Sequence, residues 1–484
     1  MFGGTNIHYE MSEKTRGFCC GGLGAFVKLV QQVGLDQEID ARVHVLKRHL
    51  PYHESDHVLN VAYNVLTGGV RLEDLELRRQ DEVYLDALGT QRIPDPTTAG
   101  DFTRRFEAAD ILQLIQSINQ VQSRLWDWSC GGKKGKQKKR FKLAVVDVDG
   151  TISETLGECK AGIGLSYKGI WGYAPLLLSL ANTKEVLYLE NRPGNVASHQ
   201  NAAAAMDRVI GLLEPHAERI CFRGDTDFSL TTHFDCWSER VDFVFGMDAH
   251  QSFVQRAEAL PDKAWKEVAR RPKYAVKTAP RQKPENVKER IVREKEYRNI
   301  KLTSEHVAEF AYRPTKCKKT YRMVALRKNL SVEKGEQVLF DDLRYFFYIT
   351  TRTDLTAEEV VFFANERCDQ ENVIEQLKNG VNAMRMPVDN LLSNWAYMVM
   401  ASLAWNMKAW LAVMMPKEAS RDQVMRMEYR QFLHAFVLLP CQIVKTGRKI
   451  VYRILGYNRW LPDFFAAFAR IRKLKIPIPQ PAPS

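Results

Sequence analysis

The chain has 484 residues, of which 45% are hydrophobic, a fraction typical of globular proteins that form two or three domains around a large core. Its formal net charge of +12 and isoelectric point near 9.1 favour a polyanionic partner, most simply nucleic acid, although such an excess can also serve solubility. Nine cysteines without a CxxC pair argue against a disulfide framework or structural zinc and favour a reducing compartment.

The sequence predicts neither secretion nor a membrane span. The N-terminus lacks the basic and then apolar segments of a signal peptide, so we expect a cytoplasmic protein. The most hydrophobic stretch, 391–415, contains Asn394, Asn406 and Lys408, which predicts a buried core helix without membrane association.

Residues 1–128 form a predicted helical region, because apolar residues recur at helical spacing within it. The segments with this spacing are 25–50, 56–68 and 103–127. His53 and His57 match the HExxH pattern of zinc proteases, but they follow a Pro-Tyr turn, so a capped helix start is the better interpretation. Residues 129–140 follow as a basic, glycine-rich linker that serves either as a solvated hinge or as a contact to phosphates. Its cations include Lys133, Lys134, Lys138, Lys139 and Arg140.

Residues 141–255 alternate between predicted strands and short helices. The expected strands are 142–148, 173–180, 185–190, 218–223 and 241–246, with a helix at 201–213. The first strand is apolar and carries Asp147 and Asp149 on one face, where burial is costly unless a metal, a proton or a partner compensates. Asp225 and Asp227 follow the strand at 218–223, and the carboxyl ends of strands are where α/β sheets usually place their chemistry.

Residues 256–340 are expected to form a basic, β-rich insertion. Positions 263–328 hold 21 Lys and Arg against 7 Glu, interleaved with aromatic residues such as Trp265. Cations that contact phosphates and rings that stack on bases are typical of a nucleic-acid surface.

Residues 341–390 are expected to return to the core, with a strand at 343–350 and a helix that begins at Thr356. Arg367, Glu371 and Lys378 then fall on one stripe of a helix, which fits a functional face or a plain salt-bridge ladder.

Residues 391–484 are expected to form a helical, basic C-terminal region. Lys445, Arg448, Lys449 and Arg453 would lie near one helical face, and the Pro-rich tail 476–484 is expected to be disordered.

The motif Asp147-Val148-Asp149-Gly150-Thr151 allows two interpretations. It matches the DxDGT signature of haloacid-dehalogenase-type phosphatases, in which Asp147 would be the nucleophile, Asp149 the general acid, and Gly224-Asp225 would help to bind Mg²⁺. However, the spacing from Asp225 to Asp227 is short for the last acidic motif of that family. A small-molecule phosphatase would also leave the basic insertion and the Glu371 helix without a role.

The second interpretation uses all of these features. Asp149 precedes Gly-Thr, Asp225 follows Arg-Gly, and Glu371 lies in Arg-x₃-Glu-x₆-Lys, with separations of 76 and 146 residues between the three acids. In this the chain resembles DDE insertion-sequence transposases of the group 1 DDE superfamily endonuclease type. Further similar segments are 172–176, 192–195, 367–372, 392–411 and 447–449. One departure is Ala364, where members of that family usually have Tyr.

The resemblance implies an α/β fold with a ribonuclease-H-like core, a mixed five-stranded sheet with helices on both sides, into which the β-rich insertion is placed. It implies a transposase that binds terminal inverted repeats and catalyses strand cleavage and transfer in cut-and-paste transposition. Two Mg²⁺ ions, for which Mn²⁺ can substitute, would be held by Asp149, Asp225 and Glu371, with Asp147 as the alternative first ligand.

The resemblance also implies the partners. Double-stranded DNA, as transposon ends and as target, would be held by a homodimer located at the nucleoid of a bacterial cell. The DNA-binding residues would include Arg367 and Lys378 at the scissile strand, Trp265 of the insertion, the linker cations, and Arg448 and Lys449.

Overall fold

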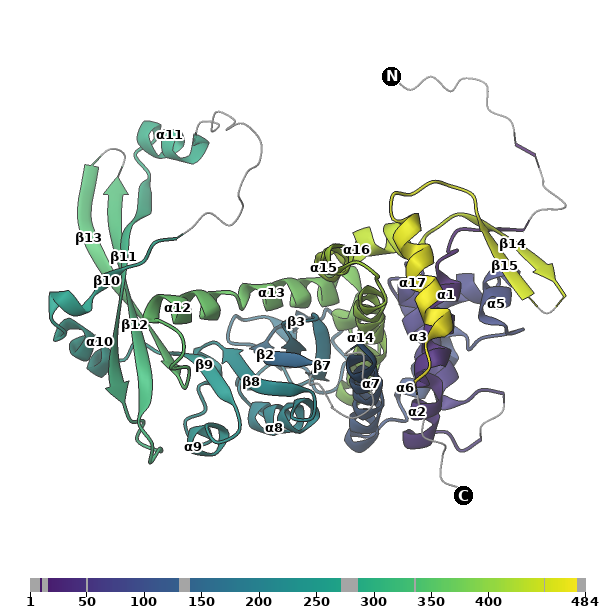
Figure 1. Cartoon of the computed structure of the whole chain (residues 1–484), viewed down its shortest axis with the longest axis horizontal. Coiled ribbons are helices and arrows are strands. Elements are labelled where there is room, and N and C mark those ends of the chain that lie inside the picture. Colours follow the sequence, from purple (N-terminus) through teal and green to yellow (C-terminus); the bar gives the residue numbers. More distant parts are fainter. Residues whose placement is uncertain are drawn as a thin grey trace.

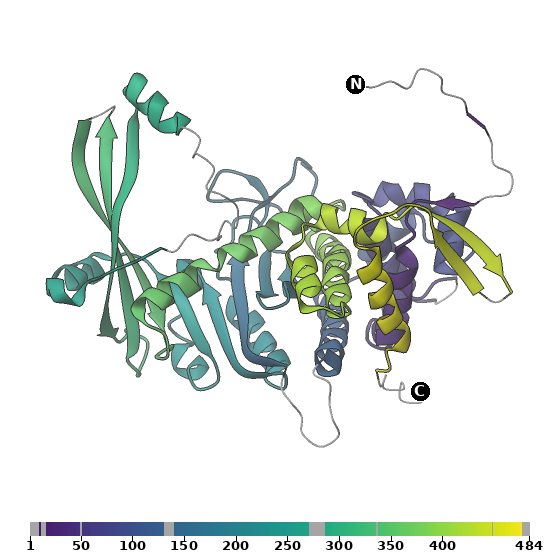
Figure 2. The ribbon, with the colours of Figure 1, turned by 45° about the horizontal axis from the view of Figure 1, so that its top comes forward.

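The computed structural model describes residues 9–10, 16–48, 51–129, 140–270, 286–334, 337–447 and 449–476. Figures 1 and 2 show a central sheet, a helical region on one side of it, and a long three-stranded arm that projects from the other side. Lys133, Lys134, Lys138 and Lys139 of the linker, as well as Arg448 and most of the Pro-rich tail, lie outside the described residues.

The core is the five-stranded mixed sheet that the sequence predicted. Its strands are β2 (Phe141–Gly150), β6 (Leu176–Leu180), β7 (Glu185–Glu190), β8 (Ala217–Gly224) and β9 (Asp242–Met247), in the spatial order β7-β6-β2-β8-β9. β2, β8 and β9 are parallel, whereas β6 and β7 form an antiparallel hairpin beside β2. β2 has a neighbouring strand on each side, which explains why it reads as an almost continuous apolar run.

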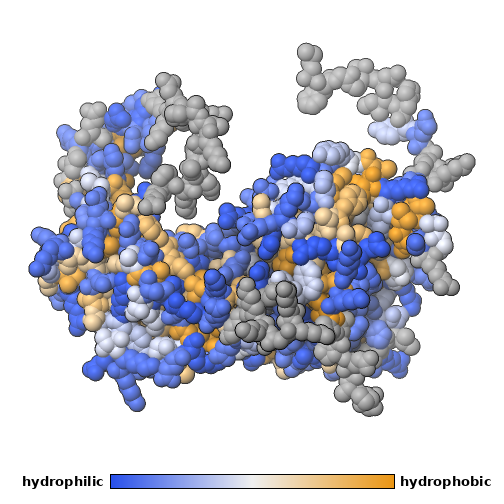
Figure 3. Space-filling model, in the orientation of Figure 1, coloured by the Kyte–Doolittle hydropathy of each residue, from blue (hydrophilic) through white to orange (hydrophobic). Residues whose placement is uncertain are grey.

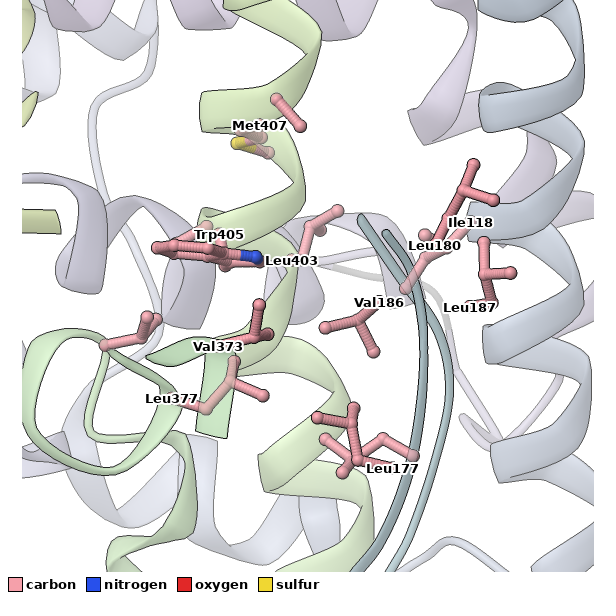
Figure 4. Close-up of a cluster of buried hydrophobic side chains, with 14 of the residues drawn as sticks. Ile118, Leu177, Leu180, Val186, Leu187, Val373, Leu377, Leu403, Trp405 and Met407 are labelled. Carbon is pink, nitrogen blue, oxygen red and sulfur yellow. The ribbon is translucent and has the colours of Figure 1, made fainter. Parts of the chain in front are cut away.

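Helices cover both faces of this sheet, also as expected. Glu185 of β7 accepts hydrogen bonds from Trp126 of α7 (Ala108–Ser129) and Trp410 of α14 (Leu391–Val413). Glu190 of the same strand accepts from Asn201 at the start of α8 (Ala202–Leu213), and Figure 1 shows α8 on the side of the sheet away from α12 and α13. Figure 4 shows the apolar packing on the side of α14, where labelled side chains of β6, β7, α7 and α14 meet Val373 and Leu377.

The N-terminal region is helical, as predicted. Its helices are α1 (Leu23–Val33), α2 (Leu35–Arg42), α3 (Glu54–Leu66), α4 (Leu75–Arg79), α5 (Glu82–Leu88), α6 (Pro96–Thr103) and α7. α3 begins directly after His53, and the buried ring of His57 stacks on Phe102 with 4.3 Å between ring centroids. The two histidines therefore belong to a helix start and its packing.

The arm consists of β11 (Arg298–Tyr312), β12 (Tyr321–Lys334) and β13 (Gln337–Thr350), joined as antiparallel neighbours. The short strand β10 (Lys266–Glu267) pairs with β11, and α10 (Gln251–Glu258) and α11 (Val287–Glu294) accompany the arm. β13 continues across position 340, where the sequence predicted the end of the insertion, and its last residues, 347–350, pair with β9. Core and arm therefore share one nine-stranded sheet.

Between β2 and β6 the chain forms a separate small sheet. It contains β3 (Ser153–Glu154), β5 (Trp171–Tyr173) and β4 (Gly164–Leu165), in this spatial order. The segment that forms it begins directly after the end of β2, and the side chains of Leu156, Tyr167 and Trp171 in this segment are exposed.

The C-terminal part departs from the sequence-based prediction at one place. Its helices are α12 (Ala357–Asn365), α13 (Cys368–Glu375), α14, α15 (Glu418–Arg426), α16 (Tyr429–Phe432) and α17 (Leu461–Lys473). The predicted basic helical face at 445–453 is wrong, because β14 (Cys441–Thr446) and β15 (Lys449–Ile454) form a hairpin to which β1 (Gly17–Phe18) adds a third strand. Half of the residues in each of the two strands are β-branched, and Gly447 has a φ of 56° in the turn.

The long helix α14 is a buried core helix, as expected. Asn394, Asn406 and Lys408 within it each donate to main-chain carbonyls. Within the described ranges, no helix has the length and apolar character needed to cross a membrane.

Candidate active site

Asp149 and Asp225 lie at neighbouring strand ends. The parallel register of β2 and β8 pairs Asp147 with Arg223, so two residues further along Asp149 and Asp225 continue the same register at the carboxyl edge of the sheet. Asp225 also caps a short 3₁₀ turn, since its Oδ1 accepts a hydrogen bond from the main-chain N–H of Asp227 at 3.0 Å. Paired residues of β2 and β8 are 76 residues apart in the sequence, as Asp147 and Arg223 are, and the same spacing separates Asp149 from Asp225.

Both carboxylates are held in an environment that disfavours their charged form. Burial raises the pKa of Asp149 to about 6, and the negative charge of Asp225 contributes in the same direction. Burial also raises the pKa of Asp225, with added repulsion from Asp227 and Asp248. A pair of desolvated, mutually repelling carboxylates is stabilised by a cation placed between them.

Arg367 supplies one such cation. Its Nη1 donates to Oδ2 of Asp149 at 2.8 Å, and its positive charge lowers the pKa of both aspartates against the effect of burial. Arg367 lies at the N-terminal end of α13, so the ion pair fixes the start of this helix above the end of β2.

The remaining stripe of α13 faces the same way. Lys378, in the π-helical turn Gln376–Gly380, donates to the main-chain oxygen of Ile152 at 2.7 Å, just beyond the end of β2. Glu371 lies between Arg367 and Lys378 on this stripe, and its side chain is exposed. As the side chains stand, the described part of the chain contains no cluster of three or more His, Cys, Asp or Glu that could hold a metal ion. The structure thus brings Asp149, Asp225 and Arg367 together and leaves Glu371 on the adjoining exposed stripe.

Asp147 occupies a different environment. Its side chain is 1% exposed, and both carboxylate oxygens accept from Arg223, at 2.7 and 2.9 Å. Arg223 also donates to the carbonyl of Phe363 and to Glu366, which ties the sheet to the end of α12. Burial raises the pKa of Asp147 against the pull of Arg223, and Asp147 in turn keeps the pKa of Arg223 high.

Two further contacts position α13, and sequence reasoning missed both of them. The buried amide of Gln370 donates from Nε2 to the main-chain oxygens of Asp147 and Leu177, at 2.9 and 3.2 Å. On the other flank of the helix, Lys184 donates to Asp369 at 2.6 Å. The only sequence signal was that residues 367–372 resemble a family segment, and nothing in the sequence indicated which strands the helix would contact.

The other predicted DNA-binding residues lie at several places. Trp265 is only 9% exposed, because the guanidinium of Arg327 covers its ring at 4.3 Å and Tyr345 lies beside it. Arg140 is half-buried next to the ring of Phe141, and Lys449 is exposed at the start of β15.

Comparison with protein families identifies the chain. The family described as "Transposase DDE domain group 1" matches residues 19–476. The chain belongs to this family of DDE transposases. A comparison with curated proteins finds no match. Among solved structures, the transposase is similar to the piggyBac transposase in a synaptic complex with hairpin DNA, at 10% identity and a TM-score of 0.35, over 87% of this chain and 81% of that chain.

Family membership confirms the resemblance found in the sequence and favours it over the DxDGT phosphatase. Asp147, which the phosphatase would need as its nucleophile, is fully buried in this transposase and paired on both oxygens.

The molecule is hollowed between the arm and the helical region, and Figure 3 shows mainly hydrophilic residues along this hollow. Figures 1 and 2 show α12 and α13 crossing between these two parts. Lys168 of the small-sheet segment lies close enough to Lys378 for its charge to lower the pKa of Lys378, in addition to the effect of burial.

Proposed function

We propose that this transposase binds the terminal inverted repeats of its element and catalyses cleavage and strand transfer at Asp149, Asp225 and Glu371. The observation that carries the proposal is the pair of buried aspartates, Asp149 and Asp225, at neighbouring strand ends, with Arg367 bound to Asp149. The chain that holds this pair matches the transposase family from residue 19 to residue 476. Cut-and-paste transposition is the overall reaction that this site would serve.

The donor set fits a divalent metal. Carboxylate oxygens are the hard ligands that Mg²⁺ and Mn²⁺ prefer, and repulsion between Asp149 and Asp225 would be relieved by a cation. We propose that these two aspartates hold the metal and that Glu371 completes the set, with two ions as the full complement. When bound, the metal would supply activation of a water or a 3′-hydroxyl and stabilisation of the leaving oxygen.

The residues around the acids would bind and orient the DNA. Arg367 would exchange Asp149 for a phosphate oxygen of the scissile strand, since a guanidinium suits both partners. Lys378 and Lys168 provide further cations beside the stripe that carries Glu371. The exposed rings of Tyr167 and Trp171 lie on the same small-sheet segment, where bases could stack on them.

We further propose that DNA follows the hollow toward the arm and the linker. Net positive charge in the arm and at the linker gives phosphate contacts, which would make binding strongly salt-dependent. Trp265 would act through Arg327, which it supports, rather than by stacking on a base. Lys449 and Arg448 of the C-terminal hairpin turn and the linker lysines would contact flanking DNA, and two copies of the chain would hold the two element ends.

The test uses the purified full chain, Mg²⁺ or Mn²⁺, and a labelled duplex that carries the terminal repeat of the element. Wild type should nick at the repeat boundary, whereas Glu371→Gln and Asp149→Asn should bind the repeat without cleaving it. Glu375→Gln is the matched control, because this exposed residue lies one turn further along the same helix. Metal-dependent cleavage that survives Glu371→Gln, or absence of repeat-specific binding, would refute the proposal.

A further inference from the structure

The distal half of β13 is an open edge of the arm. β12 pairs with β13 along its whole length, but on its other side β9 pairs only with residues 347–350. Among the described residues, no strand covers the edge from 337 to 346, which Figure 1 shows at the outer side of the arm. An open edge presents unpaired N–H and C=O groups and can add a strand from another chain.

This edge also exposes large apolar side chains. Phe340, Leu343 and Phe346 are 50%, 51% and 42% exposed, a level unusual for three aromatic and aliphatic residues within seven positions. Between them lie Asp342 and Arg344, whose side chains are 35% and 52% exposed and form an ion pair with each other at 2.9 Å, so that one negative and one positive group are presented side by side. These five residues, 340, 342, 343, 344 and 346, are called the β13 edge below.

The β13 edge is complementary to itself when two copies run antiparallel. If Leu343 faces Leu343 of a second copy, Asp342 faces Arg344 of that copy, and Phe340 faces its Phe346. The Asp342–Arg344 and Phe340–Phe346 pairs each occur twice because of the two-fold symmetry, whereas the Leu343 pair lies on the axis and occurs once. Directly opposite residues of antiparallel strands lie in contact, so opposite charges and aromatic pairs stabilise this register. The neighbouring registers that keep the same face would place Arg344 against Arg344 or Asp342 against Asp342.

We propose that this transposase forms a two-fold dimer in which the β13 edges of two copies pair as antiparallel strands about Leu343. Such a contact is isologous and closed, so it yields a dimer and no filament. The inference goes beyond the proposed function, because it assigns a surface to self-association. It is tested without DNA, so its failure would leave the cleavage test unaffected.

The test is a charge exchange, read as oligomeric state by light scattering and sedimentation of the purified full chain. Asp342→Arg and Arg344→Asp should each give monomers, since like charges then face each other twice. Mixing these two variants should restore a dimer, because every pair is again opposite in charge. The double variant Asp342→Arg/Arg344→Asp should dimerise by itself for the same reason.

Matched controls come from α11 of the same arm. Glu289→Arg and Arg293→Asp cause the same charge changes at an exposed i,i+4 pair away from the edge, and both should dimerise like wild type. Leu343→Cys should be trapped by mild oxidation as a disulfide-linked dimer through residue 343, whereas a cysteine at the exposed Tyr297 should not.

Three results would overturn the proposal. Wild type could remain monomeric at tens of micromolar, the single variants could dimerise as well as the controls, or the mixture could fail to re-form a dimer. If Arg344→Asp lowered DNA affinity while no variant changed the oligomeric state, the edge would contact DNA instead of a second copy.

Discussion

Arg367 and Asp149 form an ion pair at 2.8 Å that joins the N-terminal end of α13 to the end of β2. Both side chains are mostly buried, at 22% and 15% exposure. The guanidinium therefore neutralises part of a carboxylate pair that burial and mutual repulsion would otherwise leave strained. A metal ion or a DNA phosphate that enters the site has to compete for one of the two partners.

Because of this competition, removal of the Arg367 side chain should strengthen metal binding but slow DNA cleavage. Arg367→Ala should bind Mn²⁺ about tenfold more tightly, because a positive charge next to Asp149 is removed. The same variant should cleave repeat DNA at least about a hundredfold more slowly, because the phosphate loses its guanidinium partner. Arg367→Lys should have a metal affinity and a cleavage rate between those of wild type and Arg367→Ala. A Mn²⁺ titration and a single-turnover cleavage assay measure the two effects.

Arg430→Ala serves as the control, since this arginine is exposed on α16. Equal weakening of Mn²⁺ affinity and of cleavage in Arg367→Ala would instead mean that the arginine only maintains the local fold.

The core of the site could be predicted from sequence because its signals are local. β2 reads as an apolar run with two aspartates at fixed spacing, and the second aspartate follows another apolar strand. The partners of these residues could not be predicted, because they depend on which strands become neighbours. Arg223 precedes Asp225 in the sequence, but only the parallel register of β2 and β8 reveals that it pairs with Asp147.

The C-terminal hairpin shows a different limit. Lys445, Lys449 and Arg453 are spaced by four residues, which fits one face of a helix and equally one face of an extended strand. The decisive signal was the enrichment in β-branched residues on both sides of Gly447, which favours two strands and a turn.

Each member of the buried Asp147–Arg223 pair should be needed for stability as long as the other is present, but apolar residues should be able to replace the pair as a whole. Asp147→Leu or Arg223→Met alone should destabilise the protein by about 3–5 kcal/mol, because each leaves one buried charge uncompensated. The double variant Asp147→Leu/Arg223→Met should recover much of this loss. Urea unfolding of the four proteins measures the coupling. Additive losses would show that the two residues act separately, contrary to the geometry.

Gln370 should act as a positioning residue for α13. Gln370→Leu removes two hydrogen bonds to main-chain oxygens of β2 and β6, at a cost of about 0.5–1.5 kcal/mol each. We expect slower cleavage with unchanged affinity for repeat DNA, since the side chain is buried away from solvent. Gln370→Glu should be as slow, because a carboxylate cannot donate, whereas Gln370→His should recover part of the rate. Loss of DNA affinity in parallel with cleavage would contradict a positioning role.

Lys408 should make stability depend on pH. It is 2% exposed, its Nζ donates to the main-chain oxygen of Met425 at 2.9 Å and lies 3.9 Å from the ring centre of Trp405. Burial lowers its pKa to about 7, with added repulsion from Lys184. Below about pH 7 both the folded and the unfolded chain carry this proton, and the cost of the buried charge is fully present.

Between about pH 7 and 10 the folded chain releases the proton first, so this lysine adds stability as the pH rises. Lys408→Met should remove that rise and should stabilise the protein near pH 6 by about 2 kcal/mol, after the loss of the bond to Met425 is offset. Melting temperatures over this range measure the effect, and Lys417→Met, at an exposed position before α15, is the control. If the melting temperatures of wild type and Lys408→Met changed with pH in the same way, the prediction would be wrong. The contacts with Met425 and Trp405 would then offset the whole cost of burying the ammonium group.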